Sequence, residues 1–173
     1  IVLVADADGD VVGATLGNDV NLRDFEGRSA LLLGKAKDNN AACAIGPLIR
    51  LFDGDFTLDD VRGSVVDLTI EGMDGYRLTG SSSMSQISRD PADLVRQAMS
   101  EHHYPDGFAL FLGTMFAPTQ DRDAPGRGFT HKEGDIVTIS SERLGTLVNK
   151  VTSAKAAPAW SFGIGDLMRN LAA

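Results

Sequence analysis

The stretch from residue 65 to residue 79, Val-Val-Asp-Leu-Thr-Ile-Glu-Gly-Met-Asp-Gly-Tyr-Arg-Leu-Thr, decides the fold class of this chain. Apolar residues at every second position of its first half alternate with Asp, Thr and Glu, which is the period of a half-buried β-strand. Asp74-Gly75 is a dipeptide favoured in tight hairpin turns. A second short run of strand formers, Tyr76–Thr79, follows this turn. The stretch therefore predicts an antiparallel β-hairpin.

Apolar runs on both sides of this hairpin predict further strands. The chain begins with the apolar run Ile1–Ala5, and a turn rich in Asp and Gly separates it from the run Val11–Leu16, so the first twenty residues predict another hairpin. The remaining predicted strands are 47–52, 108–112, 135–140 and 144–151. Strands without regular helical crossovers indicate an antiparallel or mixed β fold.

Two helices are predicted. The first has Asp90 as its N-cap and Pro91 at its first position, followed by an apolar stripe that ends at Met99. A weaker pattern covers 165–171. The segment 117–128, rich in Pro, Gly and Asp, predicts a long loop, and we expect its Asp121-Arg122-Asp123 run to be solvated.

The composition indicates one globular domain over residues 1–173, with 16 Lys and Arg against 24 Asp and Glu and a formal net charge of −8. No basic cluster is present, so we expect no nucleic-acid partner. No apolar run approaches the ~20 residues of a membrane span, so we expect a cytoplasmic protein without membrane contact. The chain starts without Met inside an apolar run, from which we expect an upstream segment to be missing.

The most informative stretch for function is residues 17–26, Gly-Asn-Asp-Val-Asn-Leu-Arg-Asp-Phe-Glu, where polar and charged residues follow a predicted strand. Further motifs follow in order: Gly34–Lys37, Ile45–Pro47, Leu112–Thr114, Gly134–Val137 and Leu144–Val151. Taken in this order and spacing, they resemble the signature of the fumarylacetoacetate hydrolase family over about residues 11–151. The resemblance implies a mainly β (α+β) fold, a mixed β-sandwich roll with one or two short helices, and a single catalytic domain.

The resemblance also implies a metal site. Family members hold a divalent cation with two Glu of a Glu-x-Glu strand and a downstream Asp, and Asp19 matches that Asp. The Glu pair would lie just before Ile1, in the upstream segment. Oxygen ligands of this kind suit Mg²⁺, or Mn²⁺ or Ca²⁺, better than zinc. The alternative is that Asp19 is an ordinary turn or capping carboxylate.

Lys37 matches the active-site Lys of the family, whose charge would stabilise the enolate of a 2-oxo acid substrate. Its alternative is a solvated surface Lys. Arg23 would either clamp the substrate carboxylate or pair with Asp24. Further substrate-binding residues implied by the resemblance are Asn18, Ser83 and Thr114.

Glu26 bears on the choice between two reactions known in the family. Hydrolases of the family that cleave the carbon–carbon bond of acylpyruvates or other diketo acids commonly carry Gln at this place, whereas Arg23–Gly27 resembles the branch of 2-keto-3-deoxyarabinonate dehydratase-like enzymes. A carboxylate here can transfer a proton, which a Gln amide cannot, and the alternative is that Glu26 is a solvated loop residue. The first hypothesis is therefore a Mg²⁺-dependent lyase that dehydrates a 2-keto-3-deoxy pentonate through a metal-bound enolate, with Lys37 and Glu26 as catalytic residues. The second is a carbon–carbon hydrolase, and the third is an inactive binding or assembly domain.

The resemblance also favours a homodimer or homotetramer. Family members commonly associate through this domain, and apolar residues such as Phe108, Leu110 and Phe111 occur in a predicted strand that could contribute to an interface.

Overall fold

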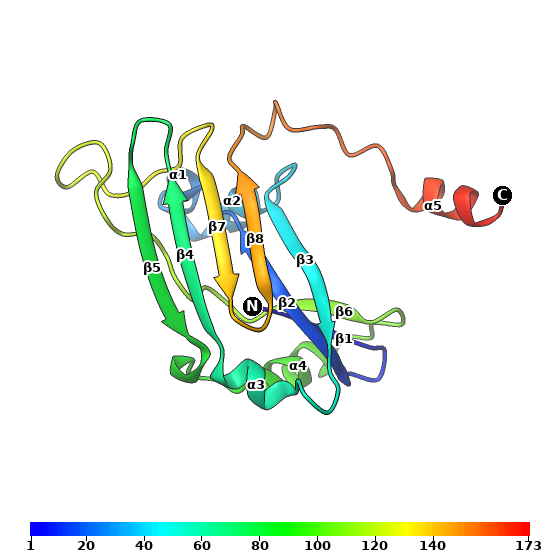
Figure 1. Cartoon of the computed structure of the whole chain (residues 1–173). Helices are drawn as coiled ribbons and strands as arrows, with labels where there is room; N and C mark the ends of the chain where they lie inside the picture. The colour runs from blue at the N-terminus through cyan, green and yellow to red at the C-terminus, as the bar shows by residue number, and fades with distance from the viewer. The chain divides into compact units, whose positions relative to one another are not determined.

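The structure is a computed structural model that describes all residues from Ile1 to Ala173 (Figure 1). The chain forms two compact units. The first unit consists of Ile1–Asn18 and Cys43–Val151, and the second consists of Asp19–Ala42 and Thr152–Ala173.

The first sheet contains the predicted N-terminal hairpin. Its order is β3-β2-β1-β6, and β1 runs antiparallel to both β2 and β6. Its strands are β1 (Val2–Ala5), β2 (Val11–Asp19), β3 (Cys43–Leu51) and β6 (Phe108–Phe111). The carboxylate of Asp6 closes the turn between β1 and β2, because it accepts the backbone N–H of Asp8 at 3.0 Å and of Asp10 at 2.9 Å.

The second sheet contains the hairpin predicted for residues 65–79. Its order is β5-β4-β7-β8, and all three neighbouring pairs are antiparallel. Its strands are β4 (Val65–Glu71), β5 (Arg77–Ser83), β7 (Ile136–Ser141) and β8 (Gly145–Lys150). Gly75 adopts φ +80°, the left-handed region that makes Gly the favoured residue at this turn. Both hairpins, and the mainly β class, are confirmed.

The structure contains more helices than the two expected. The α-helices are α1 (Arg23–Glu26), α2 (Leu33–Lys37), α3 (Leu58–Gly63), α4 (Pro91–Met99) and α5 (Ile164–Leu171), and the 3₁₀ turns are η1 (Ala30–Leu32) and η2 (Met84–Gln86). In α4 the side chain of Asp90 caps the N–H of Ala92 at 2.8 Å, as predicted. The three additional helices have four to six residues, too few for an apolar period to be visible in the sequence.

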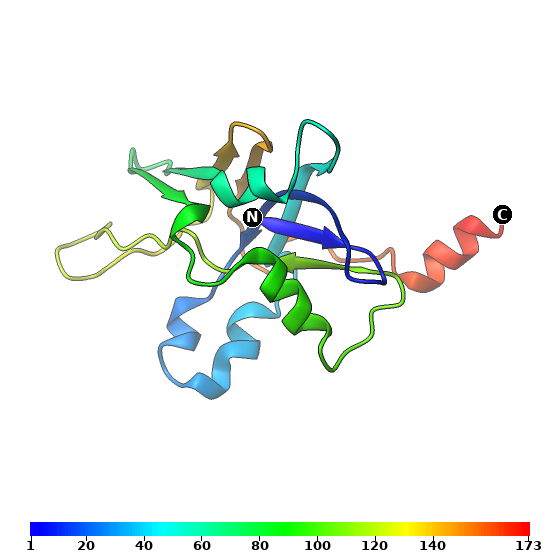
Figure 2. The same ribbon diagram turned by 90° about the horizontal axis from the view of Figure 1, so that it is seen from below.

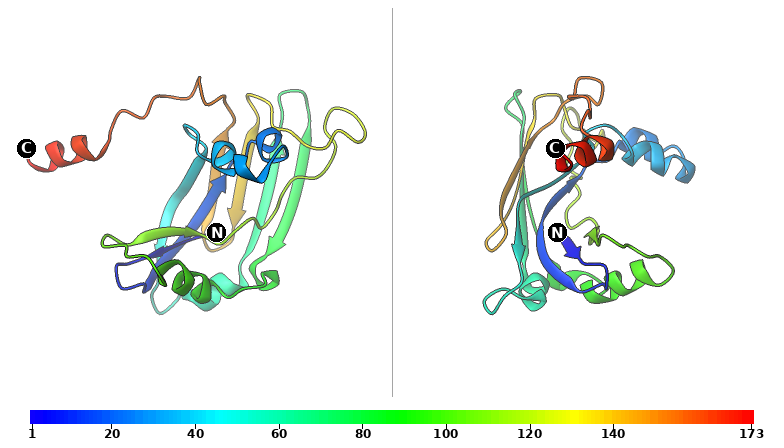
Figure 3. Two further views of the ribbon diagram at one scale, coloured as in Figure 1. Left: turned by 180° about the vertical axis from the view of Figure 1, so that it is seen from behind. Right: turned by 90° about the vertical axis from the view of Figure 1, so that its right-hand side faces the viewer.

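The main core of the first unit lies between its two sheets. It combines Leu3 and Leu16 of the first sheet with Val66 and Leu147 of the second, and Phe56 is fully buried beside them. Figures 2 and 3 show that α3 and α4 lie at the same end of the two sheets, where they contribute Val61 and Val95 to this core. Burying each of these apolar side chains contributes about 1.5–3 kcal/mol, which holds the sandwich together.

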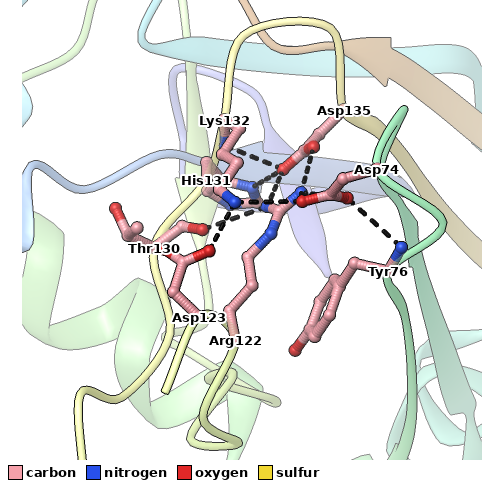
Figure 4. Close-up of polar contacts among 8 residues, drawn as sticks. All are labelled: Asp74, Tyr76, Arg122, Asp123, Thr130, His131, Lys132 and Asp135. Atoms are coloured by element: carbon pink, nitrogen blue, oxygen red, sulfur yellow. Dashed lines mark hydrogen bonds and ion pairs between the residues drawn. The ribbon is translucent and has the colours of Figure 1, made fainter.

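The loop between β6 and β7 is anchored by a charge cluster with a buried centre, which we call the Arg122 cluster: Asp74, Arg122, Asp123, His131, Lys132 and Asp135 (Figure 4). The side chains of Arg122 and Asp135 are each 1% exposed. The guanidinium donates to both Asp135 oxygens, at 2.5 and 2.8 Å, and to Asp74 Oδ1 at 3.1 Å. The expectation that the 121–123 run is solvated is therefore wrong for Arg122, because partners distant in sequence bury its charge.

The electrostatics of the cluster favour the charged forms of its members. Burial alone would raise the pKa of Asp135, but the Arg122 guanidinium and the backbone N–H of Lys132 outweigh it and hold that pKa below its ordinary value. The pKa of Asp74 is also lowered, by Lys132 first and then by Arg122. Burial is the main reason why the pKa of His131 falls, which favours its neutral form. The cluster therefore fixes the loop through ionised carboxylates.

None of the five α-helices is long and apolar enough to cross a membrane.

Candidate active site

The segment from Asp19 to Ala42 carries most of the residues expected at the site. Two backbone hydrogen bonds tie its two arms together: the N–H of Val20 donates to the carbonyl of Ala42 at 3.0 Å, and the N–H of Leu22 donates to the carbonyl of Ala36 at 3.0 Å. The short helices α1 and α2 both lie within this segment. The segment thus closes on itself and brings residues from its beginning and its end into contact.

Asp19 and Lys37 meet as a result of this closure. The Nζ atom of Lys37 lies 2.6 Å from Oδ2 of Asp19, and the two side chains are 31% and 47% exposed. An ion pair this exposed contributes at most about 1 kcal/mol to stability, so its interest is chemical. The neighbouring Lys35 instead lies over the ring of Phe25, with Nζ 5.1 Å from the ring centroid.

Glu26 lies at the end of α1 and is half-buried. The stretch 17–26 was expected to follow a strand, and the structure places Glu26 on a short helix seven residues after the end of β2. Its Oε2 atom accepts a hydrogen bond from Nδ2 of Asn21. Arg23 is exposed at the first position of α1 and forms no ion pair, so the expected alternative of a pair with Asp24 is not found.

The other three expected site residues lie in the first unit. Nδ2 of Asn18 donates to Oδ1 of Asn149 at 3.1 Å and so joins β2 to β8. The hydroxyl of Ser83 accepts the N–H of Ser85 at 3.2 Å and caps η2. Thr114 is exposed just beyond β6 and follows Gly113, whose φ is +100°. None of the three forms a hydrogen bond with another of them.

One residue of this segment, Asp19, matches a metal ligand of the family. The carboxylate of Asp19 is accessible, and its oxygen donors suit a hard cation such as Mg²⁺. Among residues 1–173, however, no group of three or more His, Cys, Asp or Glu side chains is placed to hold a metal. Asp19 therefore fits as one ligand of such a site.

Sequence reasoning missed two residues of interest. Asn21 stands five positions before Glu26, a spacing that gives no signal for a contact until the short helix between them is known. Arg122 stands in a segment whose composition is typical of an exposed loop. In both cases the missing information was the backbone path of a short irregular segment.

Comparisons with known proteins identify relatives of this chain. The model of the family "Fumarylacetoacetate (FAA) hydrolase C-terminal" matches residues 2–152. A protein of Haloferax volcanii named "Probable 2-keto-3-deoxyxylonate dehydratase" is 31% identical over 145 residues, which is 84% of this chain and 47% of that protein. The "2-dehydro-3-deoxy-D-arabinonate dehydratase" of Saccharolobus solfataricus is 28% identical over 154 residues, which is 87% of this chain and 47% of that protein.

Solved structures give the same result. One is described as "2-keto-3-deoxy-D-arabinonate dehydratase complexed with magnesium and 2,5-dioxopentanoate"; it matches 86% of this chain and 50% of its own with a TM-score of 0.73 and 27% identity. The chain spans about half the length of the curated relatives it matches. The resemblance seen in the sequence motifs is confirmed, together with the branch it favoured. The chain belongs to the fumarylacetoacetate hydrolase family.

Proposed function

We propose that this chain is a catalytic domain of a divalent-metal-dependent lyase that dehydrates a 2-keto-3-deoxy pentonate. The observation that carries the proposal is that one closed segment presents both an Asp19–Lys37 pair and the half-buried carboxylate of Glu26. Relatives named as dehydratases of such sugar acids support the choice of substrate class. We further propose one catalytic domain over residues 1–173, with Asp19 as one of its metal ligands.

Each residue of the segment has a role in this proposal. When bound, Mg²⁺ would polarise the 2-oxo group and so acidify the proton at the neighbouring carbon, C3. Lys37 places a positive charge where the enolate oxygen develops, and Asp19 holds that side chain in position. Glu26 takes the proton from C3 and passes it to the hydroxyl at C4, which leaves as water.

The substrate carboxylate needs donors, and the four proposed ones, Asn18, Arg23, Ser83 and Thr114, differ in the partners that they already have. The Arg23 guanidinium has no ion-pair partner, and the hydroxyl of Thr114 has no hydrogen-bond partner within the chain, so both are available. Asn18 and Ser83 already bond to Asn149 and Ser85 and would have to share their donors. The rest of the proposal is a cytoplasmic enzyme without nucleic-acid or membrane partners, and the net charge of −8 supports the absence of a nucleic-acid partner.

An assay of substrate consumption tests the function. The protein, together with any sequence that precedes Ile1 in its gene, is incubated separately with a 2-keto-3-deoxy pentonate and with an acylpyruvate. We expect the pentonate to be consumed in Mg²⁺, spared after chelation and consumed again when Mg²⁺, or Mn²⁺ or Ca²⁺, is restored. Consumption of the acylpyruvate instead would establish the hydrolase, and inertness toward both would establish a binding or assembly domain.

We also propose that the protein forms a homodimer or homotetramer, and the structure indicates a different surface from the one expected. Phe108 and Leu110 of β6 pack against the core and are only half exposed. The edge strand β3 instead exposes a row of large apolar side chains: Ile45, Leu48, Ile49 and Leu51. An exposed apolar edge strand favours pairing with another chain, so β3 is the better candidate interface.

Replacing Leu48 by Glu is expected to weaken self-association at least about tenfold, because Leu48 is 77% exposed and its apolar contacts would be lost to a charge. Sedimentation velocity over a range of micromolar concentrations measures the effect. Met73→Glu is the matched control, since Met73 is 83% exposed in the turn between β4 and β5. Equal association constants for the two variants would exclude β3 as the interface.

A further inference from the structure

We infer that Asn21 is the positioning residue of Glu26 and that its side-chain amide serves both protonation states of that carboxylate. The inference rests on the proposed function, in which Glu26 takes up a proton and then gives it away. No motif match assigned a role to Asn21. Its assignment comes from one contact and one unpaired atom in the structure.

The contact is built by a single turn of helix. The N–H groups of Phe25 and Glu26 both donate to the carbonyl of Leu22, at 2.9 and 3.2 Å, which brings the end of α1 back over its beginning. Asn21 stands one residue before Leu22, so its side chain meets that of Glu26 and donates from Nδ2 to Oε2. Both side chains are half-buried. The backbone therefore fixes the distance between the two groups.

The unpaired atom is Oδ1 of Asn21, which is buried and has no hydrogen-bond partner. A buried acceptor left unpaired costs about 1–3 kcal/mol, so such an atom calls for an explanation. It lies on the same planar amide whose other end already contacts Glu26. The orientation of the amide is therefore set by its donation to Glu26 and not by a hydrogen bond at its other end.

This orientation of the amide matches what an acid–base carboxylate requires. While Glu26 is ionised, its Oε2 accepts the N–H of Asn21, as the structure shows. When Glu26 takes the proton from C3 on its other oxygen, Oε1, the atom Oε2 becomes the carbonyl oxygen of the neutral acid and still accepts the same N–H. Asn21 thus holds Glu26 in one place through both halves of the proton transfer and leaves Oε1 to pass the proton to the C4 hydroxyl.

The isosteric substitution Asn21→Asp tests this role, because it keeps the shape of the side chain and removes its only donor. We expect kcat for dehydration to fall roughly 10- to 100-fold with little change in KM, since Asn21 touches Glu26 and not the substrate. Asn21→Ser, whose hydroxyl both donates and accepts, should retain more activity than Asn21→Asp or Asn21→Ala. Thermal melting of each variant shows whether it folds normally.

A double-mutant cycle separates positioning from a structural role. In a Glu26→Gln background no proton transfer remains to be supported, so adding Asn21→Asp should change kcat by less than about twofold. Full additivity of the two substitutions, or an Asn21→Asp variant with the kcat of the wild type, would overturn the inference. If the wild type itself does not dehydrate the pentonate, the proposed function fails instead, so the two failures are distinguishable.

Discussion

Replacing Arg122 by Met is expected to lower the free energy of unfolding by about 3–5 kcal/mol, because it leaves the buried carboxylate of Asp135 without its main counter-charge. The side chain of Asp135 is 1% exposed, and it would lose two hydrogen bonds from the guanidinium. The backbone N–H of Lys132, which donates to Asp135 at 2.9 Å, cannot balance the charge by itself. Chemical denaturation of wild type and variant at neutral pH measures the difference.

Arg96→Met is the matched control for this prediction. Arg96 also forms an ion pair with an Asp, Asp93, but its side chain is 70% exposed on α4. Its loss should cost less than about 1 kcal/mol, because water already screens the pair. If Arg122→Met costs no more than Arg96→Met, the Arg122 cluster does not hold the loop between β6 and β7.

The pH dependence of the Arg122→Met effect supplies a second readout. The pKa values of Asp135 and Asp74 are lowered in the folded protein, so their ionisation contributes stability above the ordinary Asp pKa of about 3.9. That contribution is lost as the pH falls below this value. In Arg122→Met the carboxylate of Asp135 loses its main stabilising partner while Asp74 keeps Lys132, so the difference in unfolding free energy between wild type and variant should narrow as the medium becomes acidic.

The sequence allowed the β architecture to be predicted because strand signals are local. Alternation over Val65–Glu71 and the Asp74-Gly75 turn specify a hairpin without reference to the rest of the chain, and the same holds for the capped helix that begins at Pro91. The environment of Arg122 could not be predicted from such local signals. One of the carboxylates that it contacts belongs to Asp74, which is 48 residues away, and nothing in the local composition indicates that contact.

The candidate site likewise contains residues that the sequence predicted and a contact that it did not. The family motif indicated Asp19 and Lys37, and the structure joins them across 18 residues of sequence. The contact between Asn21 and Glu26 was not predictable, because it depends on a four-residue helix below the length at which periodicity is visible. The spacing of the motifs therefore identified the charged residues of the candidate site, whereas the backbone path of short segments determines which side chains they contact.

Glu26→Gln is expected to lower kcat for dehydration by roughly 10²- to 10⁴-fold with a modest change in KM. The amide preserves the shape of the side chain, and its carbonyl can still accept from Nδ2 of Asn21, so the fold of α1 is maintained. What it cannot do is take the proton from C3 and release it to the departing C4 hydroxyl. Steady-state kinetics with a 2-keto-3-deoxy pentonate and Mg²⁺ measure the loss.

Asp24→Asn is the matched control, since it makes the same acid-to-amide change on the same short helix at an exposed residue without an ion-pair partner. It should leave kcat within about twofold of the wild type, as is usual for a surface substitution. A Glu26→Gln variant as active as Asp24→Asn would remove Glu26 from the proton transfer. Because no other acid of α1 is held by a neighbouring amide, the proton would then have to move through a group outside this helix.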